Sequence, residues 1–211
     1  MPGLVLSTNV AHIQQDPGGD DRISGINKLP VATGIDVFIP GPNYGDGSGV
    51  VGDAIGDSLH HGGAHKAIYA YSREELDFFD PTYRNGYFGE NLTTSGIVLE
   101  DLLINQQVRI GTTLLEVSIP RRPCRTFAHW LDIKGWLKTF TQRGLPGSYF
   151  RVIEEGHINP GDPIEVLQAP DHDITMSMAF RAKMGNKDLA RRVVAANCLP
   201  ARYHEELLKL I

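Results

Sequence analysis

The sequence is poor in cysteine and has no long hydrophobic run. Its 211 residues include only two cysteines, Cys124 and Cys198, which do not amount to the disulfide framework of a small secreted domain. No stretch approaches the roughly eighteen apolar residues of a membrane-spanning helix. Residues 1–7 have neither the basic start nor the long apolar core of a signal peptide. We therefore expect a cytoplasmic protein that does not cross a membrane.

Several familiar binding motifs are also missing. The sequence has no G-x-x-x-x-G-K-[ST] loop for phosphates and no His or Cys pair at zinc-finger spacing. Residues 47–52 fit G-x-G-x-x-G, but the following residues 53–57 make a poor helix, so the context of a dinucleotide site is absent. A calcium loop starting at Asp46 fails because Val51 stands where a sharp-turn glycine is required.

The composition, with 41% hydrophobic and 21% charged residues, is that of a globular protein with one sizeable domain. Apolar and β-branched segments separated by glycine and proline turns predict many short strands. The expected strands are 4–10, 34–39, 66–71, 107–110, 113–119, 148–153 and 164–167. Many strands with few helices favour a barrel or closed sheet over βαβ units.

Helices interrupt this pattern and then replace it. Ser72 and Glu75 form a capping-box pattern, which predicts a helix from Arg73. A second helix is expected within 127–143, where apolar residues fall at helical spacing and Gly144 ends it. After a linker at 169–173, amphipathic segments predict three helices at 174–184, 187–198 and 201–210. The fold is therefore expected to be mainly β, with a barrel over 1–168 and a three-helix subdomain over 174–211, in which Cys198 is a structural residue.

The charge is uneven along the chain. Residues 174–211 hold seven Lys or Arg and three Asp or Glu, a net charge of +4, which leaves −9 for the remainder of a chain whose total is −5. A solvated helical face explains this asymmetry as well as a surface for an acidic partner does.

Cys124 lies in a sequence that favours chemistry at its sulfur. It follows an expected strand in the segment Pro120-Arg121-Arg122-Pro123-Cys124-Arg125, where two prolines restrict the backbone. Nearby cations favour the thiolate, the form that attacks electrophiles and binds metals. Most free cysteines are small buried hydrophobes, but that interpretation leaves the arginines unexplained.

Two further segments are candidates for a site. In His60-His61-Gly62-Gly63-Ala64-His65-Lys66 the glycines could bring backbone N–H groups close to an anion, with Lys66 adding charge. A tight turn with solvent-facing histidines explains this segment equally well. The polar residues of Phe88-Gly89-Glu90-Asn91-Leu92-Thr93-Thr94 fit either the rim of a site or a surface turn.

These three segments, in this order, together with Gly52-Asp53, Asp57, residues 144–151 and Asn159-Pro160-Gly161-Asp162, resemble the MOSC domain, named for the molybdenum cofactor sulfurase C-terminus. The stand-alone bacterial YiiM-type branch is the most similar, since it also carries three C-terminal helices. Three positions depart from the family pattern: Ala64 and His65 stand where Pro and Asp are expected, and Leu145 where a cation is frequent. These departures affect the shape expected for the cofactor cleft.

The resemblance implies a barrel that holds a molybdenum–pyranopterin cofactor, with Cys124 as the catalytic residue and the sulfur ligand of the metal. Residues implied in cofactor binding are His61, Gly62, Gly63, Lys66, Asn91, Arg121, Arg122, Arg125 and Arg151. The implied activity is the reduction of N-hydroxylated compounds, including purine bases, to amines or amidines. A soft thiolate suits molybdenum, and Arg and Lys suit a phosphate.

Two other functions remain open: a non-catalytic carrier of the cofactor or of sulfur, and a cofactor-free redox thiol at Cys124. For an enzyme, the resemblance implies a flavoprotein or ferredoxin-type electron donor. Because such donors are commonly acidic, we expect the cationic tail from about Ile174 to dock the donor and to lie apart from the catalytic centre. A nucleic acid is a weaker candidate partner on an otherwise acidic protein. A third possibility is that the tail only packs on the barrel or on a second subunit.

Overall fold

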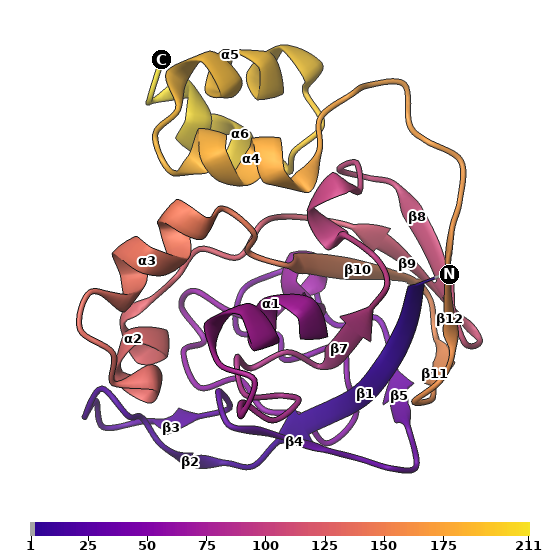
Figure 1. The fold of residues 1–211 in the computed structure, drawn as a ribbon. Coiled ribbons are helices and arrows are strands. Elements are labelled where there is room, and N and C mark those ends of the chain that lie inside the picture. Colours follow the sequence, from indigo (N-terminus) through magenta and orange to yellow (C-terminus); the bar gives the residue numbers. More distant parts are fainter. Residues whose placement is uncertain (1–2) are drawn as a thin grey trace.

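A computed structural model describes residues 3–211, and its main feature is a closed barrel of seven strands (Figure 1). The barrel strands are β1 (Gly3–Ala11), β6 (Ile68–Ser72), β7 (Leu92–Ser95), β8 (Gln107–Ile110), β9 (Thr113–Val117), β10 (Ser148–Glu154) and β12 (Pro163–Val166). They pair in the order β12-β8-β9-β10-β6-β7-β1, and pairing of β1 with β12 closes the barrel. The β6–β7 pair is parallel and the others are antiparallel. The expected barrel is confirmed.

One barrel strand, β7, was not among the predicted strands, and further short strands that the sequence pattern did not predict lie outside the barrel. Strands β2 (Gln14–Gln15) and β3 (Ile23–Ser24) pair with each other, and β4 (Lys28–Pro30) extends the sheet beside β1. Strand β5 (Ile35–Val37), which was expected, pairs with β11 (Gly156–Ile158), which was not. Segments of two or three residues are too short to show a hydrophobic period.

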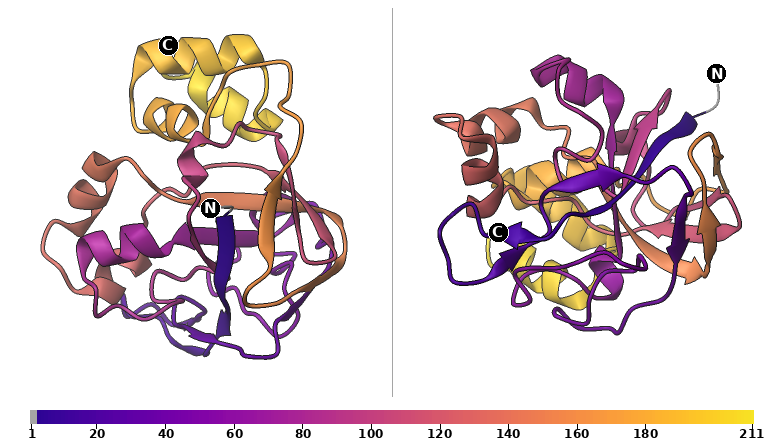
Figure 2. Two further views of the ribbon diagram at one scale, coloured as in Figure 1. Left: turned by 45° about the vertical axis from the view of Figure 1, so that its right-hand side comes forward. Right: turned by 90° about the horizontal axis from the view of Figure 1, so that it is seen from below.

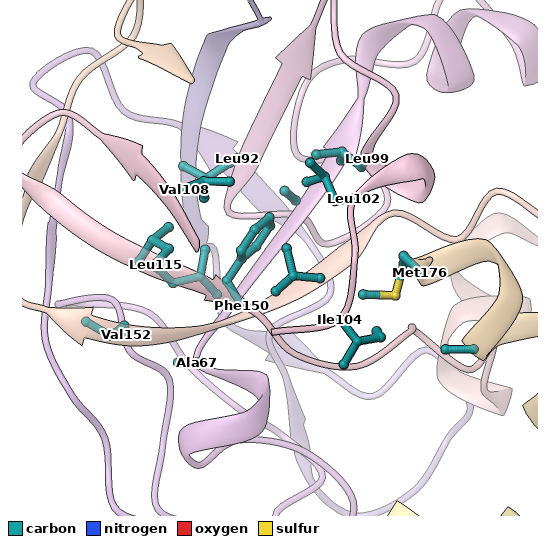
Figure 3. Close-up of a cluster of buried hydrophobic side chains, with 14 of the residues drawn as sticks. Ala67, Leu92, Leu99, Leu102, Ile104, Val108, Leu115, Phe150, Val152 and Met176 are labelled. Atoms are coloured by element: carbon teal, nitrogen blue, oxygen red, sulfur yellow. The ribbon is translucent and has the colours of Figure 1, made fainter. Parts of the chain in front are cut away.

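The barrel interior is filled by aliphatic side chains and Phe150 (Figure 3). Strand β6 is buried on both faces, which explains its continuous apolar sequence. Its Ile68 and Ala70 belong to the barrel core, whereas Tyr69 and Tyr71 belong to a second, aromatic core outside the barrel.

The aromatic core is covered by three helices: α1 (Arg73–Phe79), α2 (Arg125–Leu131) and α3 (Trp136–Arg143). Helix α1 begins as predicted, with the Ser72 hydroxyl accepting from the Glu75 N–H at 3.2 Å. The single helix expected within 127–143 is wrong, because Asp132 and Gly135 adopt left-handed backbone conformations and divide the segment into α2 and α3. Apolar residues of both helices, Phe127 of α2 and Trp136 and Phe140 of α3, pack into one aromatic cluster. Their positions along the sequence therefore look like the buried face of a single helix.

The predicted C-terminal helices are α4 (Met176–Lys183), α5 (Lys187–Ala196) and α6 (Ala201–Leu208), grouped at one end of the barrel (Figures 1 and 2). Met176 and Ala179 pack in the same hydrophobic core as Leu102 and Ile104 of the barrel domain. The Met176 N–H also donates to the Leu102 carbonyl at 2.8 Å. The helices therefore continue the barrel core, and Cys198 is buried among them as predicted.

Two short 3-10 helices, η1 (Ala64–Lys66) and η2 (Leu99–Asp101), complete the elements. Helix η1 lies directly before β6 and carries Lys66 of the candidate site. Within residues 3–211, no helix combines the length and the apolar sequence needed to cross a membrane.

Candidate functional site

Two cavities meet at Cys124. An inner cavity of about 100 Å³ lies among the loops of residues 22–28 and 48–57. An outer cavity of about 400 Å³ lies between segments 57–66 and 120–125, helix α3, and helices α4 and α6. Both cavities are lined by Asp57, His61, Lys66 and Cys124. The structure thus brings two of the predicted segments to one place, on either side of a single thiol.

Cys124 is placed by the start of α2. It is the N-cap residue of this helix, with an extended backbone, and its side chain makes no capping hydrogen bond. The thiol is partly buried rather than sealed in the core. A cysteine at a helix N-terminus, open to two cavities, can act as a metal ligand or as a nucleophile.

The three arginines around Cys124 point to different places. Arg121 is buried, donates to the Phe88 carbonyl, and lies 3.9 Å from the ring centroid of Phe127 while lining the inner cavity. Arg122 is exposed and lines the outer cavity. Arg125 also lines the outer cavity but forms an ion pair with Asp20. Arg122 is therefore the arginine of this segment with the most freedom to bind an anion.

Lys66 and His61 bring one charged and one neutral group to the junction of the cavities. The ammonium of Lys66 donates to the His60 carbonyl at 2.6 Å and lies 4.8 Å from the ring centroid of Tyr44. Burial lowers the pKa of Lys66 to about 8 and the pKa of His61 to about 3. At neutral pH His61 is therefore an uncharged imidazole, and Lys66 is the cation at the junction.

The glycines of this loop have a different role from the predicted one. The Gly63 N–H donates to the Gly47 carbonyl at 2.8 Å, so it closes the loop onto residues 41–47 and does not face a ligand. Gly62 and Gly63 line neither cavity. Both have positive φ angles, of 83° and 74°, which glycine adopts without strain. They fix the path of the chain into η1 and thereby place Lys66.

The floor of the inner cavity is a buried polar network around Asp53. Its carboxylate pairs with Lys28 and accepts hydrogen bonds from Asn91 Nδ2 at 2.9 Å and Ser48 Oγ at 2.8 Å. Burial opposes the charged form, but Lys28 together with the hydrogen bonds from Asn91 and Ser48 outweighs it, so the pKa of Asp53 is lowered. Asn91 was predicted in the site and lines this cavity. Asp53 and Lys28 were not predicted as site residues, because they meet only through the fold.

The C-terminal helices form one wall of the outer cavity. Lys183 of α4 and Arg202, Tyr203 and Glu206 of α6 line it together with Cys124. The expectation that the tail lies apart from the catalytic centre is therefore wrong. Helical periodicity identified the faces of these helices but carried no information on what each face would meet.

Arg151 lies outside both cavities. Its guanidinium pairs with Glu116 at 2.6 Å and contacts the His65 ring nitrogen at 3.2 Å. The sequence-based assignment of Arg151 to cofactor binding is not supported by this position. His65, one of the departures from the family pattern, thus faces Arg151 rather than the cavities.

The residues present fit a metal that arrives with its own organic ligands. Within residues 3–211 no group of three His, Cys, Asp or Glu side chains could hold a bare metal ion. One thiol stands at the junction of the cavities, with cations beside it that could pair with a phosphate. A molybdenum–pyranopterin cofactor needs this combination, a sulfur ligand from the protein and cationic side chains for its phosphate.

Comparison with known proteins identifies the family of this chain. The MOSC domain matches residues 57–165. The YflK protein of Bacillus subtilis (strain 168) is 32% identical over 182 residues, which cover 84% of this chain and 79% of YflK. The chain belongs to the MOSC domain family.

Two further relatives are informative. A crystal structure of YiiM from Geobacillus stearothermophilus matches with a TM-score of 0.76 and 26% identity and covers 99% of each chain. A protein of Gibberella moniliformis named "Reductase" is 30% identical over 177 residues, which cover 80% of this chain but only 30% of that protein. Membership of the MOSC family links this chain to a function related to the molybdenum cofactor.

Proposed function

We propose that this protein binds a molybdenum–pyranopterin cofactor at the junction of its two cavities and reduces N-hydroxylated compounds, such as N-hydroxylated purine bases. The observation that carries the proposal is the position of Cys124, a partly buried thiol shared by both cavities and flanked by cationic side chains. The electrons would come from a flavoprotein or a ferredoxin-type donor.

Each residue of the site has a role in this proposal. Cys124 would be the sulfur ligand of the metal, and Lys66 and Arg122 would pair with the cofactor's phosphate. His61 is neutral and half-buried, so it can contact the cofactor without adding charge. Arg121 holds the Phe88 loop at the rim of the inner cavity, which makes it a positioning residue.

The net reaction takes up two electrons and two protons, breaks the N–O bond, and releases water and the amine or amidine. When bound, the cofactor supplies the two-electron chemistry. The protein contributes a cavity of about 400 Å³ beside Cys124, within the range of about 300–1,000 Å³ typical of small-molecule sites.

Turnover by Cys124 variants tests the proposal. Because the Cys124 side chain makes no capping bond and serine is a favoured N-cap residue, Cys124→Ser should fold normally. We expect it to lose reduction of an N-hydroxylated purine base with a small chemical reductant. The matched control, Cys198→Ser, changes the thiol that lies away from both cavities and should keep turnover. Full activity in Cys124→Ser would disprove the proposed role, and bound molybdenum without turnover in the unmodified protein would indicate a carrier.

A further inference from the structure

The wall that the C-terminal helices contribute to the outer cavity is positively charged. Lys183 and Arg202 both reach the same carboxylate, Glu206, with Arg202 Nε at 3.6 Å from Glu206 Oε1. Arg122, from the segment before α2, lines the same cavity. Two cations on the helices therefore share one carboxylate, and a third cation lines the cavity with them.

The remaining charges of the cavity do not neutralise this excess. Asp57 is engaged by His60, at 3.0 Å, and by Arg22, at 3.5 Å. Arg125, which also lines the cavity, pairs with Asp20, which does not. Lys183 is the least exposed of the helical cations, with 16% of its side chain accessible. Burial and the charges of Arg122 and Arg202 lower the pKa of Lys183, as expected where cations face one another.

Aromatic side chains stand next to these cations. The hydroxyl groups of Tyr44 and Tyr203 are hydrogen-bonded to each other, and the Arg202 guanidinium lies 4.5 Å from the Tyr44 ring centroid. Both tyrosines line the cavity that contains Cys124. The cavity thus combines tyrosine side chains and cations beside them with the Cys124 thiol, a combination suited to a ring system that carries an anionic substituent.

We propose that the physiological substrate carries an anionic group, a phosphate or a carboxylate, which Lys183 and Arg202 bind while its N-hydroxylated end faces Cys124. The C-terminal helices then act as the specificity element of the site. The N-hydroxylated part of the substrate rests on the function proposed above, whereas the anionic part rests on the charges of the cavity. The cofactor's own phosphate is the other anion that these side chains could bind.

Binding of non-reactive nucleotides tests the anionic part without turnover. Adenosine 5′-monophosphate and adenosine, which differ only in the phosphate, would be titrated into the purified holoprotein by calorimetry. We expect the monophosphate to bind at least about tenfold more tightly, as for one or two charge-assisted contacts. Lys183→Gln and Arg202→Gln should each remove most of this preference. The control Arg191→Gln removes the same charge from α5, which lines neither cavity, and should keep the preference.

Kinetics and metal content then separate the two sources of the anion. With N-hydroxylated adenosine and its 5′-monophosphate as substrates, Lys183→Gln should raise the ratio of KM for the monophosphate to KM for the nucleoside about tenfold or more, at unchanged molybdenum content. A loss of molybdenum from Lys183→Gln and Arg202→Gln would show that they bind the cofactor's phosphate and would overturn the proposal. Equal affinity of the holoprotein for adenosine and its monophosphate would also overturn it. If neither substrate is reduced, the function proposed above fails, while the calorimetric comparison still decides whether the cavity selects anions.

Discussion

The guanidinium of Arg151 donates to the side-chain oxygen of Asn105 at 2.6 Å, and the amide of Asn105 in turn donates to the Cys198 carbonyl at 2.8 Å. A residue of β10 is thereby linked to the loop before α6, which carries Arg202 and Tyr203 of the outer cavity. Because Glu116 holds the same guanidinium, Arg151 joins the barrel to the helices without touching either cavity.

Arg151→Ala should therefore reduce stability rather than cofactor affinity. Loss of its charge-assisted hydrogen bonds is expected to cost about 2–3 kcal/mol of unfolding free energy, measured by urea denaturation. Arg109→Ala, which breaks an exposed pair with Glu154, serves as the control and should cost no more than about 1 kcal/mol. Normal stability combined with a loss of molybdenum in Arg151→Ala would contradict this assignment.

The buried pair of Asp53 and Lys28 yields a second prediction. Asp53→Asn leaves the Lys28 ammonium buried without its countercharge, which should cost about 3–5 kcal/mol of stability. The double variant Lys28→Met/Asp53→Asn removes both charges and should recover much of this loss. If the double variant is as unstable as the sum of the two single variants, the two residues do not act as a pair.

Glu100 gives a prediction with a defined pH range. Its buried carboxylate accepts a hydrogen bond from the Gly147 N–H at 2.6 Å. Burial raises the pKa of Glu100 from 4.5 to about 7. Between these pH values the folded state holds a proton that the unfolded state has released, so the contribution of Glu100 to stability falls as pH rises.

The variant Glu100→Gln keeps an acceptor for the Gly147 N–H but does not titrate. We expect its unfolding free energy to rise relative to that of the unmodified protein as pH increases from 4.5 to about 7. The difference between the two unfolding free energies at each pH removes the contributions of the carboxylates that both proteins share. Asp53 is one of these, and its lowered pKa affects stability only in more acidic solutions. A difference that stays constant across this range would show that Glu100 ionises normally.

Gly63 is a position where a methyl group cannot be accommodated. A Cβ atom there would lie 2.0 Å from the Asn43 carbonyl oxygen, in addition to the strain of a φ angle of 74°. Gly63→Ala should lower stability by more than the roughly 1–2 kcal/mol of a left-handed residue alone, and it should weaken cofactor retention by displacing Lys66. Gly161→Ala, at a φ angle of 94° with open space around its Cβ, isolates the cost of the backbone angle. Similar losses in the two variants would mean that the loop tolerates the added methyl group.

The fold was largely predictable because local signals agreed with tertiary packing. Six of the seven barrel strands were predicted from their apolar and β-branched residues, whereas β7 was missed because its Thr93 and Thr94 are polar but buried. Their hydroxyl groups gave that strand the composition of a surface turn. The break between α2 and α3 was missed since it depends on Asp132 in a left-handed conformation, which non-glycine residues seldom adopt.

Only those residues of the candidate site that belong to short sequence motifs could be predicted from the sequence. Cys124, His61 and Lys66 stand out from their neighbours in sequence and do meet at the cavities. Lys183 and Arg202 look like ordinary surface cations of amphipathic helices, and their place in the site depends on how those helices pack on the barrel. Arg151 is the reverse case. It belongs to a segment that matches the family and was therefore assigned to the cofactor, but its guanidinium pairs with Glu116.

Molybdenum content tests directly whether the junction of the two cavities holds a molybdenum cofactor. The unmodified protein and Cys124→Ser would be produced in a molybdenum-replete host and analysed by mass spectrometry of the metal, with folding checked by circular dichroism. We expect stoichiometric molybdenum in the unmodified protein and a large loss in Cys124→Ser at unchanged stability. A folded, unmodified protein without molybdenum, or a Cys124→Ser variant that retains all of it, would contradict the role of Cys124 as the metal ligand of this site.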